Sequence, residues 1–260
     1  MIWIRNTPEI VERLQRDPLR SIVLLKHLKA FPDNARAFMV ASEHKAAALV
    51  LIDAYASAYD QKTYPRTSYI AFILSDHADL TEELLSAVPE SCGIVFKLFN
   101  DADRDIIAKH CHLERKTSFL SFTSDLPFSD NGGVMILDHA TDAMLEMYEM
   151  QDHSRDWLTP LLADGCAFAC AITSDEGTLS VCIAFESFGR VWEVGGVVTS
   201  PSHRGMGLGS RVVMGALTEL RRRNLLPRYQ VNEENLVSIK LARSIGMKQL
   251  FSLTHYLREQ

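Results

Sequence analysis

Three glycines stand at alternate positions where a predicted strand gives way to a predicted helix. They are Gly205, Gly207 and Gly209, in the stretch VWEVGGVVTSPSHRGMGLGSRVVMGAL that runs from Val191 to Leu217. Glycine lets the backbone curl tightly and lets a ligand approach the main-chain N–H groups. The N–H groups at the start of a helix lack partners and carry partial positive charge. The stretch therefore predicts a phosphate site at the junction.

Two familiar phosphate-binding patterns do not fit this turn. A dinucleotide-binding fingerprint needs a glycine where this chain has Ser210, and an acidic residue at the end of the next strand, where it has Asn232. A nucleotide P-loop needs a lysine directly after its last glycine, and none follows here. The spacing that does occur is R-x-x-G-x-G, formed by Arg204, Gly207 and Gly209.

The second half of the chain alternates between strand and helix patterns around this turn. Apolar residues at 208, 212, 213, 216, 217 and 220 form one face of a helix. The polar residues 174–177 separate two apolar runs, which is typical of a hairpin. The predicted helices are 142–150, 155–162, 208–223 and 235–244, and the predicted strands are 166–173, 179–186, 191–199, 227–231 and 248–257.

The first half follows a similar order of elements. Its predicted helices are 17–28, 80–88 and 102–110, and its predicted strands are 36–42, 46–54, 68–74, 93–99 and 116–123. Residues 97–122 align without a gap on 229–254, which places Asn100 on Asn232 and Phe119 on Phe251. Residues 123–133 are rich in turn formers. We therefore expect two related domains, 1–125 and 133–260.

One difference between the halves concerns the phosphate site. After the strand 68–74 the chain reads SDHADLTEE, which contains no glycine. The backbone there cannot present a row of bare N–H groups to an anion. We therefore expect the phosphate site in the second half alone.

Composition narrows the class of protein further. The 260 residues carry a net charge of −6, which argues against a nucleic acid as the main partner. The basic run Arg221-Arg222-Arg223 falls at a predicted helix end, where cations suit the helix dipole. The five cysteines form no CxxC pair, no leader pattern opens the chain, and no apolar run is long enough for a membrane helix. His110-Cys111-His112 lacks a second cluster at matching spacing. We expect a cytoplasmic protein without a metal.

At this point the sequence resembles the GNAT superfamily of acyl-CoA N-acyltransferases. The resemblance rests on R-x-x-G-x-G with Pro201 ahead of it, and on NLVSIKLARSIGM at 235–247, which is similar to the N-x-x-A-x-x-L-Y-x-x-x-G-F of the family. It implies an α/β (α+β) fold with a mixed, mostly antiparallel central sheet flanked by helices, in a tandem layout whose first half is degenerate. It also implies that the glycine loop wraps the pyrophosphate of coenzyme A and that pantetheine lies beside the preceding strand. The implied cofactor-binding residues are Val197, Val198, Thr199, Arg204, Gly205, Met206, Gly207, Leu208, Gly209, Ser210 and Asn235.

The resemblance also suggests catalytic roles. Glu193 stands on the strand before the loop, where several family members place a general base, and the alternative is a structural ion pair. The main-chain N–H near Val197 would meet the oxyanion. The tyrosine that the family often uses as the acid is absent, because the chain has Leu241-Ala242 there. Ser238 and Tyr256 are candidate substitutes, and solvent protonation of the thiolate is the third possibility.

These observations predict an N-acetyltransferase that moves an acetyl group from acetyl-CoA to a primary amine. The resemblance favours a small-molecule or amino-acid-like acceptor, and Asp152, His153 and Arg155 are candidate contacts for it. We expect no nucleic acid or membrane partner, and a monomer or a homodimer. The alternative, left open by the missing tyrosine, is a non-catalytic module that senses acyl-CoA.

Overall fold

The computed structural model describes residues 2–42, 44–125, 132–149, 155–175 and 177–259. The chain divides into two compact units. The first unit comprises Met1–Leu120 together with Leu250–Gln260, and the second comprises Ser121–Gln249. Each unit has helices packed against β-strands, and each is described in turn below.

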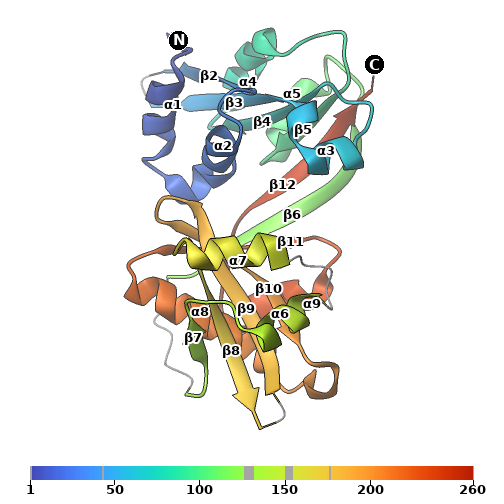
Figure 1. Cartoon of the computed structure of the whole chain (residues 1–260). Helices are drawn as coiled ribbons and strands as arrows, with labels where there is room; N and C mark the ends of the chain where they lie inside the picture. Colours follow the sequence, from blue (N-terminus) through green and yellow to red (C-terminus); the bar gives the residue numbers. More distant parts are fainter. Residues whose placement is uncertain (1, 43, 126–131, 150–154, 176, 260) are drawn as a thin grey trace. The chain divides into compact units, whose positions relative to one another are not determined.

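The first unit contains a mostly antiparallel sheet with the strand order β1-β2-β3-β4-β5-β12-β6. The one parallel pair reported in it joins β4 and β5. Helices α1 and α2 lie on one face of this sheet, and α4 and α5 lie on the other (Figure 1). The strands are β1 (Ile2–Ile4), β2 (Ala35–Ala41), β3 (Ala46–Asp53), β4 (Tyr69–Ser75), β5 (Ile94–Leu98), β6 (Glu114–Thr123) and β12 (Lys248–Arg258). The helices are α1 (Thr7–Leu14), α2 (Pro18–Ala30), α3 (Ala58–Thr63), α4 (Ala78–Leu84) and α5 (Asp101–Ile107), with 3-10 turns at Ala54–Ala56 and Leu85–Ala87.

The second unit contains a sheet with the strand order β11-β10-β9-β8-β7, and β6 is the neighbour of β11. Here the parallel pair joins β10 and β11. Helices α6 and α7 lie on one face, and α8 and α9 lie on the other (Figure 1). The strands are β7 (Met135–Leu137), β8 (Ala167–Ser174), β9 (Gly177–Phe188), β10 (Val191–Thr199) and β11 (Leu226–Asn232). The helices are α6 (Asp142–Glu149), α7 (Arg155–Ala163), α8 (Leu208–Arg222) and α9 (Leu236–Ser244), with a 3-10 turn at Pro201–His203.

These elements confirm the predicted fold class, and the expected helix face of α8 is buried. Leu208, Val212, Val213, Ala216, Leu217 and Leu220 are all at most 7% exposed. The sequence prediction missed β1, α1, α3 and β7, which are short or lack clear periodicity. The hairpin turn predicted at 174–177 includes Glu176, and most of the predicted boundary at 123–133 also lies outside the described residues.

The last strand of the chain differs from the predicted domain division. Thr254–Arg258 of β12 pair antiparallel with Ile94–Leu98 of β5. The second half of the sequence therefore supplies a strand to the first unit, and 250–260 leave the predicted domain 133–260. Strand propensity cannot predict that β12 pairs with β5, because the sequence of a strand does not specify which other strand it will pair with.

The two halves share their order of elements, but the gapless alignment between them is wrong in detail. Asn100 is the N-cap of α5, and its side chain accepts a hydrogen bond from the N–H of Asp103 at 2.8 Å. The N-cap of α9 is Asn235, whereas the alignment placed Asn100 on Asn232. The connection from β11 to α9 is longer than the connection from β5 to α5, and an alignment without gaps cannot accommodate the difference.

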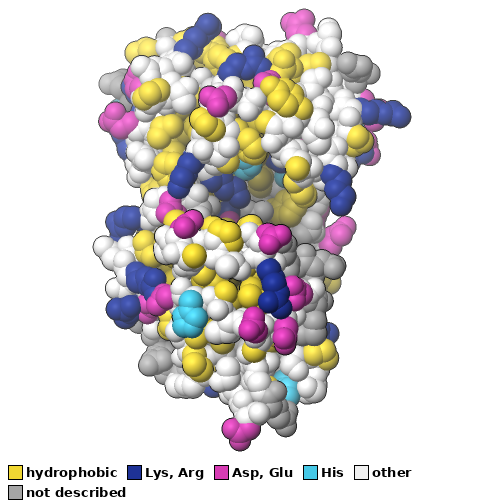
Figure 2. Space-filling model, viewed as in Figure 1, with side chains coloured by type: hydrophobic (Ala, Val, Ile, Leu, Met, Phe, Trp, Pro, Cys, Tyr) yellow, Lys and Arg dark blue, Asp and Glu magenta, His cyan; other side chains and the backbone are white. Residues whose placement is uncertain are grey.

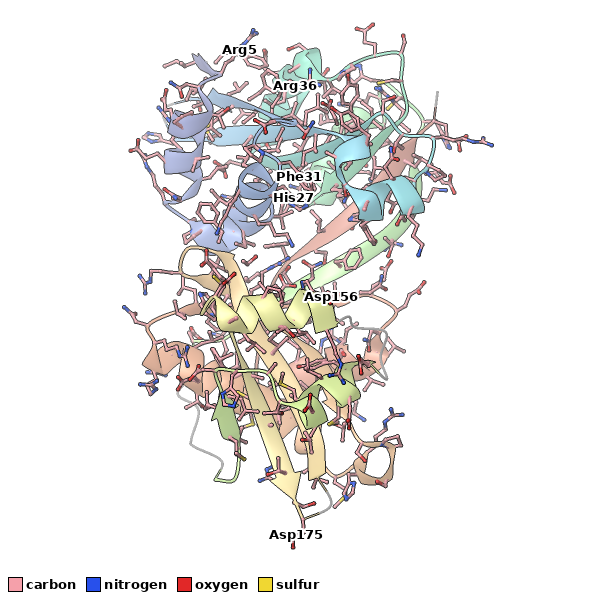
Figure 3. All side chains as sticks on the ribbon, viewed as in Figure 1. Arg5, His27, Phe31, Arg36, Asp156 and Asp175 are labelled. Atoms are coloured by element: carbon pink, nitrogen blue, oxygen red, sulfur yellow. The ribbon has the colours of Figure 1, made fainter. Side chains whose placement is uncertain are left out.

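The core of the first unit includes ionisable groups on the side of the sheet that α2 covers. The amino group of Lys97 lies 2.7 Å from the Asp60 carboxylate, and both side chains are at most 5% exposed. The hydroxyl of Tyr64 lies 2.9 Å from Nδ1 of buried His255. His27, labelled in Figure 3 beside Phe31, packs its ring 4.3 Å from the ring of Phe72. These contacts pin α2 and α3 to the sheet.

Charged side chains of opposite sign lie close together at the surface (Figure 2). On the face shown in Figure 2, Lys and Arg side chains alternate with Asp and Glu instead of gathering into a basic patch. Arg222 and Arg223 at the end of α8 bind Glu219 at 2.7 and 2.6 Å, and Arg223 also binds Asp138. Two of the three arginines of this basic run are therefore in ion pairs. No helix among the described residues is long and apolar enough to cross a membrane.

Candidate functional site

The parallel strands β10 and β11 separate part of the way along their length. Their paired residues run from Val191 opposite Leu226 to Val194 opposite Tyr229. Beyond that point β10 continues to Thr199 and β11 to Asn232. A cavity of about 270 Å³ lies between the diverging ends. It is lined by Gly195, Gly196, Val197, Val198, Tyr229, Gln230, Val231, Asn232, Asn235 and Ser238.

A bulge in β10 begins where the two strands separate. The pairing of β10 with β9 is regular from Trp192 to Gly195, skips two residues, and resumes at Val198. Gly196 has φ +56°, and a Cβ there would come 2.9 Å from Cε1 of Tyr148. The bulge leaves the main chain at Gly196 and Val197 out of register with β9, so its polar groups are available to a ligand on the open side.

The loop after β10 has the backbone of an anion nest. Gly205 and Gly207 have φ of +78° and +76°, and Met206 between them is not among the residues with positive φ. Alternation of this kind turns successive N–H groups toward one point. Gly207 is also the N-cap of α8, a helix of 15 residues. A Cβ on either glycine would meet no protein atom within 4 Å, so open space lies beside the nest.

A second cavity, of about 650 Å³, lies at this loop. Arg204 and Lys240 both line it and are exposed, and the Nε of Arg204 donates to the carbonyl of Thr199 at 3.3 Å. The cavity shares Val197, Val198, Asn235 and Ser238 with the smaller one. An elongated ligand can therefore run from the nest to the point where β10 and β11 separate. These residues fit coenzyme A, which carries a pyrophosphate on one end of a long amide chain.

Side chains behind the strand hold its end in place. Ser180 on β9 is fully buried, and its hydroxyl donates to the carbonyl of Val198 at 3.1 Å. The same hydroxyl lies 2.9 Å from Oγ1 of Thr199. The N–H of Ser200 donates to the carbonyl of Leu179 at 2.8 Å. The end of β10 is thus fixed to β9, and its opposite edge stays free of β11.

Most of the cofactor residues expected from the sequence lie together at these cavities. Met206 is the exception, because its side chain is 64% exposed and does not line either cavity. Asn235 has the N-cap role, since its Oδ1 accepts from the N–H of Ser238 at 3.0 Å. The predicted residues that line the cavities are Val197, Val198, Thr199, Arg204, Gly205, Gly207, Leu208, Gly209, Ser210, Asn235 and Ser238.

The described residues of the first unit form no counterpart of this site. Its parallel pair β4 and β5 stays in register from Tyr69 opposite Ile94 to Ile73 opposite Leu98, which is the end of β5. At the start of α4 stands Asp79, and Asp76 just before it binds Arg20 at 2.6 Å. The strands leave no gap for pantetheine, and carboxylates repel a phosphate.

Glu193, the predicted base, is held in an ion pair. Its Oε2 lies 2.6 Å from Nη1 of Arg228, whose side chain is fully buried. Arg228 also donates to Ser121 at 3.0 Å and to Gln230. Burial lowers the pKa of Arg228, and the charge of Glu193 opposes that shift. Glu193 lines neither cavity, which favours the structural ion pair over the base.

The structure changes the set of candidate acids. Tyr256 lies on the part of β12 that belongs to the first unit, where it packs with Ile94 and Phe96 in the core, 6% exposed. Its exchange into the first unit's sheet removes the basis for proposing it as the acid. Ala242 is a buried residue of α9 and offers no hydroxyl. Ser238 lines both cavities and stays a candidate.

The candidate acceptor contacts are largely outside the described residues. Asp152 and His153 fall in the segment 150–154, which the structure does not describe. Arg155 binds Glu149 at 2.6 Å and Asp142 at 3.4 Å, so its guanidinium is already engaged at the surface of α6 and α7. Its role toward an acceptor stays a prediction.

Two tyrosines at the site were missed by the sequence analysis. Tyr148 from α6 supports the bulge at Gly196, and Tyr229 from β11 lines the smaller cavity. The sequence offered one signal for Tyr229, a tyrosine within the short apolar strand predicted at 227–231. A tyrosine in such a strand does not by itself indicate a functional site. The relevance of both residues depends on where β10 bends and separates from β11.

A splayed parallel strand pair next to a glycine nest at a helix start defines an acyltransferase that uses acyl-CoA. The family model described as "Acetyltransferase (GNAT) family" matches residues 130–247. This part of the chain is a GNAT acetyltransferase domain. A search of curated protein sequences gave no significant match.

Solved structures share the fold over nearly the whole chain. A GCN5-related N-acetyltransferase from Sphaerobacter thermophilus is 13% identical with a TM-score of 0.62, covering 99% of this chain and 95% of its own. A GNAT-family acetyltransferase from Colwellia psychrerythraea is 12% identical with a TM-score of 0.59, covering 100% of both chains. A tandem GNAT protein from the clavulanic acid biosynthesis pathway is 13% identical with a TM-score of 0.52, covering 99% and 98%.

The nest predicts a sharp effect of a side chain at Gly207. We expect Gly207→Val to weaken CoA binding by at least about tenfold, because a branched residue disfavours φ +76° and fills the phosphate space. Gly165→Val is the matched control, since Gly165 has φ +69° and equally open surroundings but lies at the end of α7. Calorimetry should show loss of affinity in the first variant alone, and equal affinity in both would contradict the nest.

The ion pair makes a separate prediction for Glu193. We expect Glu193→Gln to lower the free energy of unfolding by about 2 kcal/mol, because buried Arg228 loses its counter-charge. Turnover of the folded variant should stay within about tenfold of the parent. Glu146→Gln, on an exposed position of α6, should change stability by less than about 0.5 kcal/mol. Unchanged urea denaturation with turnover reduced by about 10² or more would instead identify Glu193 as the base.

Proposed function

We propose that this protein transfers the acetyl group of acetyl-CoA to the primary amine of a small molecule. The observation that carries the proposal is the pair of cavities that share Val197, Val198, Asn235 and Ser238. Together they accommodate a pyrophosphate at the nest and an amide chain along β10. The match to the acetyltransferase family over residues 130–247 supports acyl transfer as the reaction class.

The narrow inner cavity supports a short acyl group. Its volume is about 270 Å³, and its lining residue Gly196 is packed so closely against Tyr148 that a Cβ there would lie 2.9 Å from the ring. An amine acceptor is proposed because solved neighbours of the same fold are described as N-acetyltransferases. Among the described residues, no group of three or more His, Cys, Asp or Glu side chains is placed to hold a metal ion.

The chain supplies binding and polarisation to this reaction. The nest and Arg204 would hold the pyrophosphate, and the free edge of β10 would pair with the pantetheine amides. The main-chain N–H groups at the bulge, around Val197, would face the thioester oxygen as it gains negative charge. These groups are fixed before the substrate binds, so they need no reorganisation during the reaction.

Assay of CoA release with a panel of primary amines tests the proposal. Because Glu193 is engaged by Arg228, we expect the fraction of neutral amine in solution to set the rate. For amines with a pKa near 10 the rate should rise about tenfold per pH unit between pH 7 and 9. A profile that is flat above pH 7 would show that a side chain takes the amine proton. Tight CoA binding without release for any amine would favour the acyl-CoA sensor.

A further inference from the structure

Tyr229 lies at the inner end of the cavity between β10 and β11, where the two strands stop pairing. Tyr229 is opposite Val194 in the last paired position of the two strands, so it marks the point where they separate. Its side chain is 3% exposed and lines the smaller cavity. Neighbouring side chains of a strand point to opposite faces. Tyr229 therefore faces α8 and α9, away from the Glu193–Arg228 pair.

The hydroxyl is held by a residue that lines both cavities. Tyr229 and Ser238 share a side-chain hydrogen bond, and Ser238 lies in the first turn of α9. The N–H of Ser238 is itself bound by the N-cap residue Asn235 at 3.0 Å. Burial raises the pKa of Tyr229, and the bond to Ser238 opposes that shift. The phenol thus keeps its proton at neutral and mildly alkaline pH.

The residues that the two cavities share define a path for the cofactor. A pyrophosphate at Gly205 and Gly207 places the following chain between Val197 and Val198 on one side and Ser238 on the other. From Thr199 back to Gly195, β10 spans roughly 13 Å. The sulfur end therefore arrives beside the bulge and Tyr229, which is among the residues that line the cavity.

We propose that Tyr229 is the general acid that protonates the departing CoA thiolate, and that Ser238 is a positioning residue for its hydroxyl. The inference rests on the proposed acetyl transfer. As the amine nitrogen bonds to the thioester carbon, the C–S bond breaks and its electron pair stays on sulfur. The phenol proton moves to that sulfur. The attacking nitrogen loses its extra proton to solvent and becomes the amide nitrogen. The phenolate regains a proton from solvent through Ser238, so the products are the amide and CoA thiol.

The acid strengths of the Tyr229 phenol and the CoA thiol are compatible with proton transfer from the phenol to the thiolate. A free thiol has a pKa of roughly 8.5 and a free phenol one of roughly 10. In a desolvated cavity the charged forms of both groups are disfavoured, so the thiolate becomes more basic along with the phenolate. A hydrogen bond from the phenol to the developing thiolate lowers the barrier without complete prior proton transfer.

A binding experiment tests Tyr229 without any acceptor. The affinities of CoA and of desulfo-CoA, which lacks the sulfur, are measured by calorimetry at pH 7 and pH 9.5. In the parent protein the preference for CoA should rise with pH, because the Tyr229 hydroxyl donates to the thiolate. In Tyr229→Phe that preference at pH 9.5 should be about tenfold smaller, with desulfo-CoA affinity unchanged. Tyr69→Phe, which removes a phenol from β4 of the first unit, should behave as the parent.

The turnover arm separates this inference from the proposed function. With any active amine, Tyr229→Phe should lower kcat by about 10²-fold and Ser238→Ala by about tenfold. Acetyl-seleno-CoA, whose selenolate leaves without protonation, should restore most of the rate in Tyr229→Phe. An identical pH dependence of CoA preference in the parent and in Tyr229→Phe would overturn the acid role. Absence of turnover with every amine would overturn the proposed function instead, and the binding arm would still decide the role of Tyr229.

Discussion

The separation of β10 from β11 after Val194 and Tyr229 is the constraint on which the site depends. Two parallel strands that stop pairing leave main-chain donors and acceptors exposed along both edges, and such groups are costly unless something binds them. In the second unit the bulge at Gly196 bends β10 away, while Ser180 ties the end of the strand to β9. The free edge is therefore held open by the protein and not by the ligand.

The nest works because it stands at the end of that open edge. Gly207 caps α8, whose buried face anchors the helix on the sheet through Val212, Val213 and Ala216. The phosphate donors are thereby fixed relative to β10. The first unit shows what happens without these features, since β4 and β5 pair to the end of β5 and acidic side chains stand at the start of α4. The same order of elements thus gives a parallel strand pair that stays together in the first unit and a parallel strand pair that separates around a ligand cleft in the second unit.

Much of this arrangement could be predicted from the sequence. Local signals sufficed for the strand 191–199, the helix face of α8 and the glycine turn, because each depends on neighbours along the chain. The pairing of Glu193 with Arg228 could not be predicted, since it depends on the register of two strands 35 residues apart. The same holds for Tyr256, which the strand exchange carries into the first unit, and for Tyr229, whose position matters only because the strands part beside it.

Calorimetric titration of the whole chain with CoA tests the central claim most directly. The account predicts one CoA bound per chain, because among the residues that the structure describes only those of the second unit combine a free strand edge with an anion nest. Two sites per chain would contradict the conclusion that the first unit's strands leave no cleft. Absence of binding would contradict the assignment of the two cavities to the cofactor.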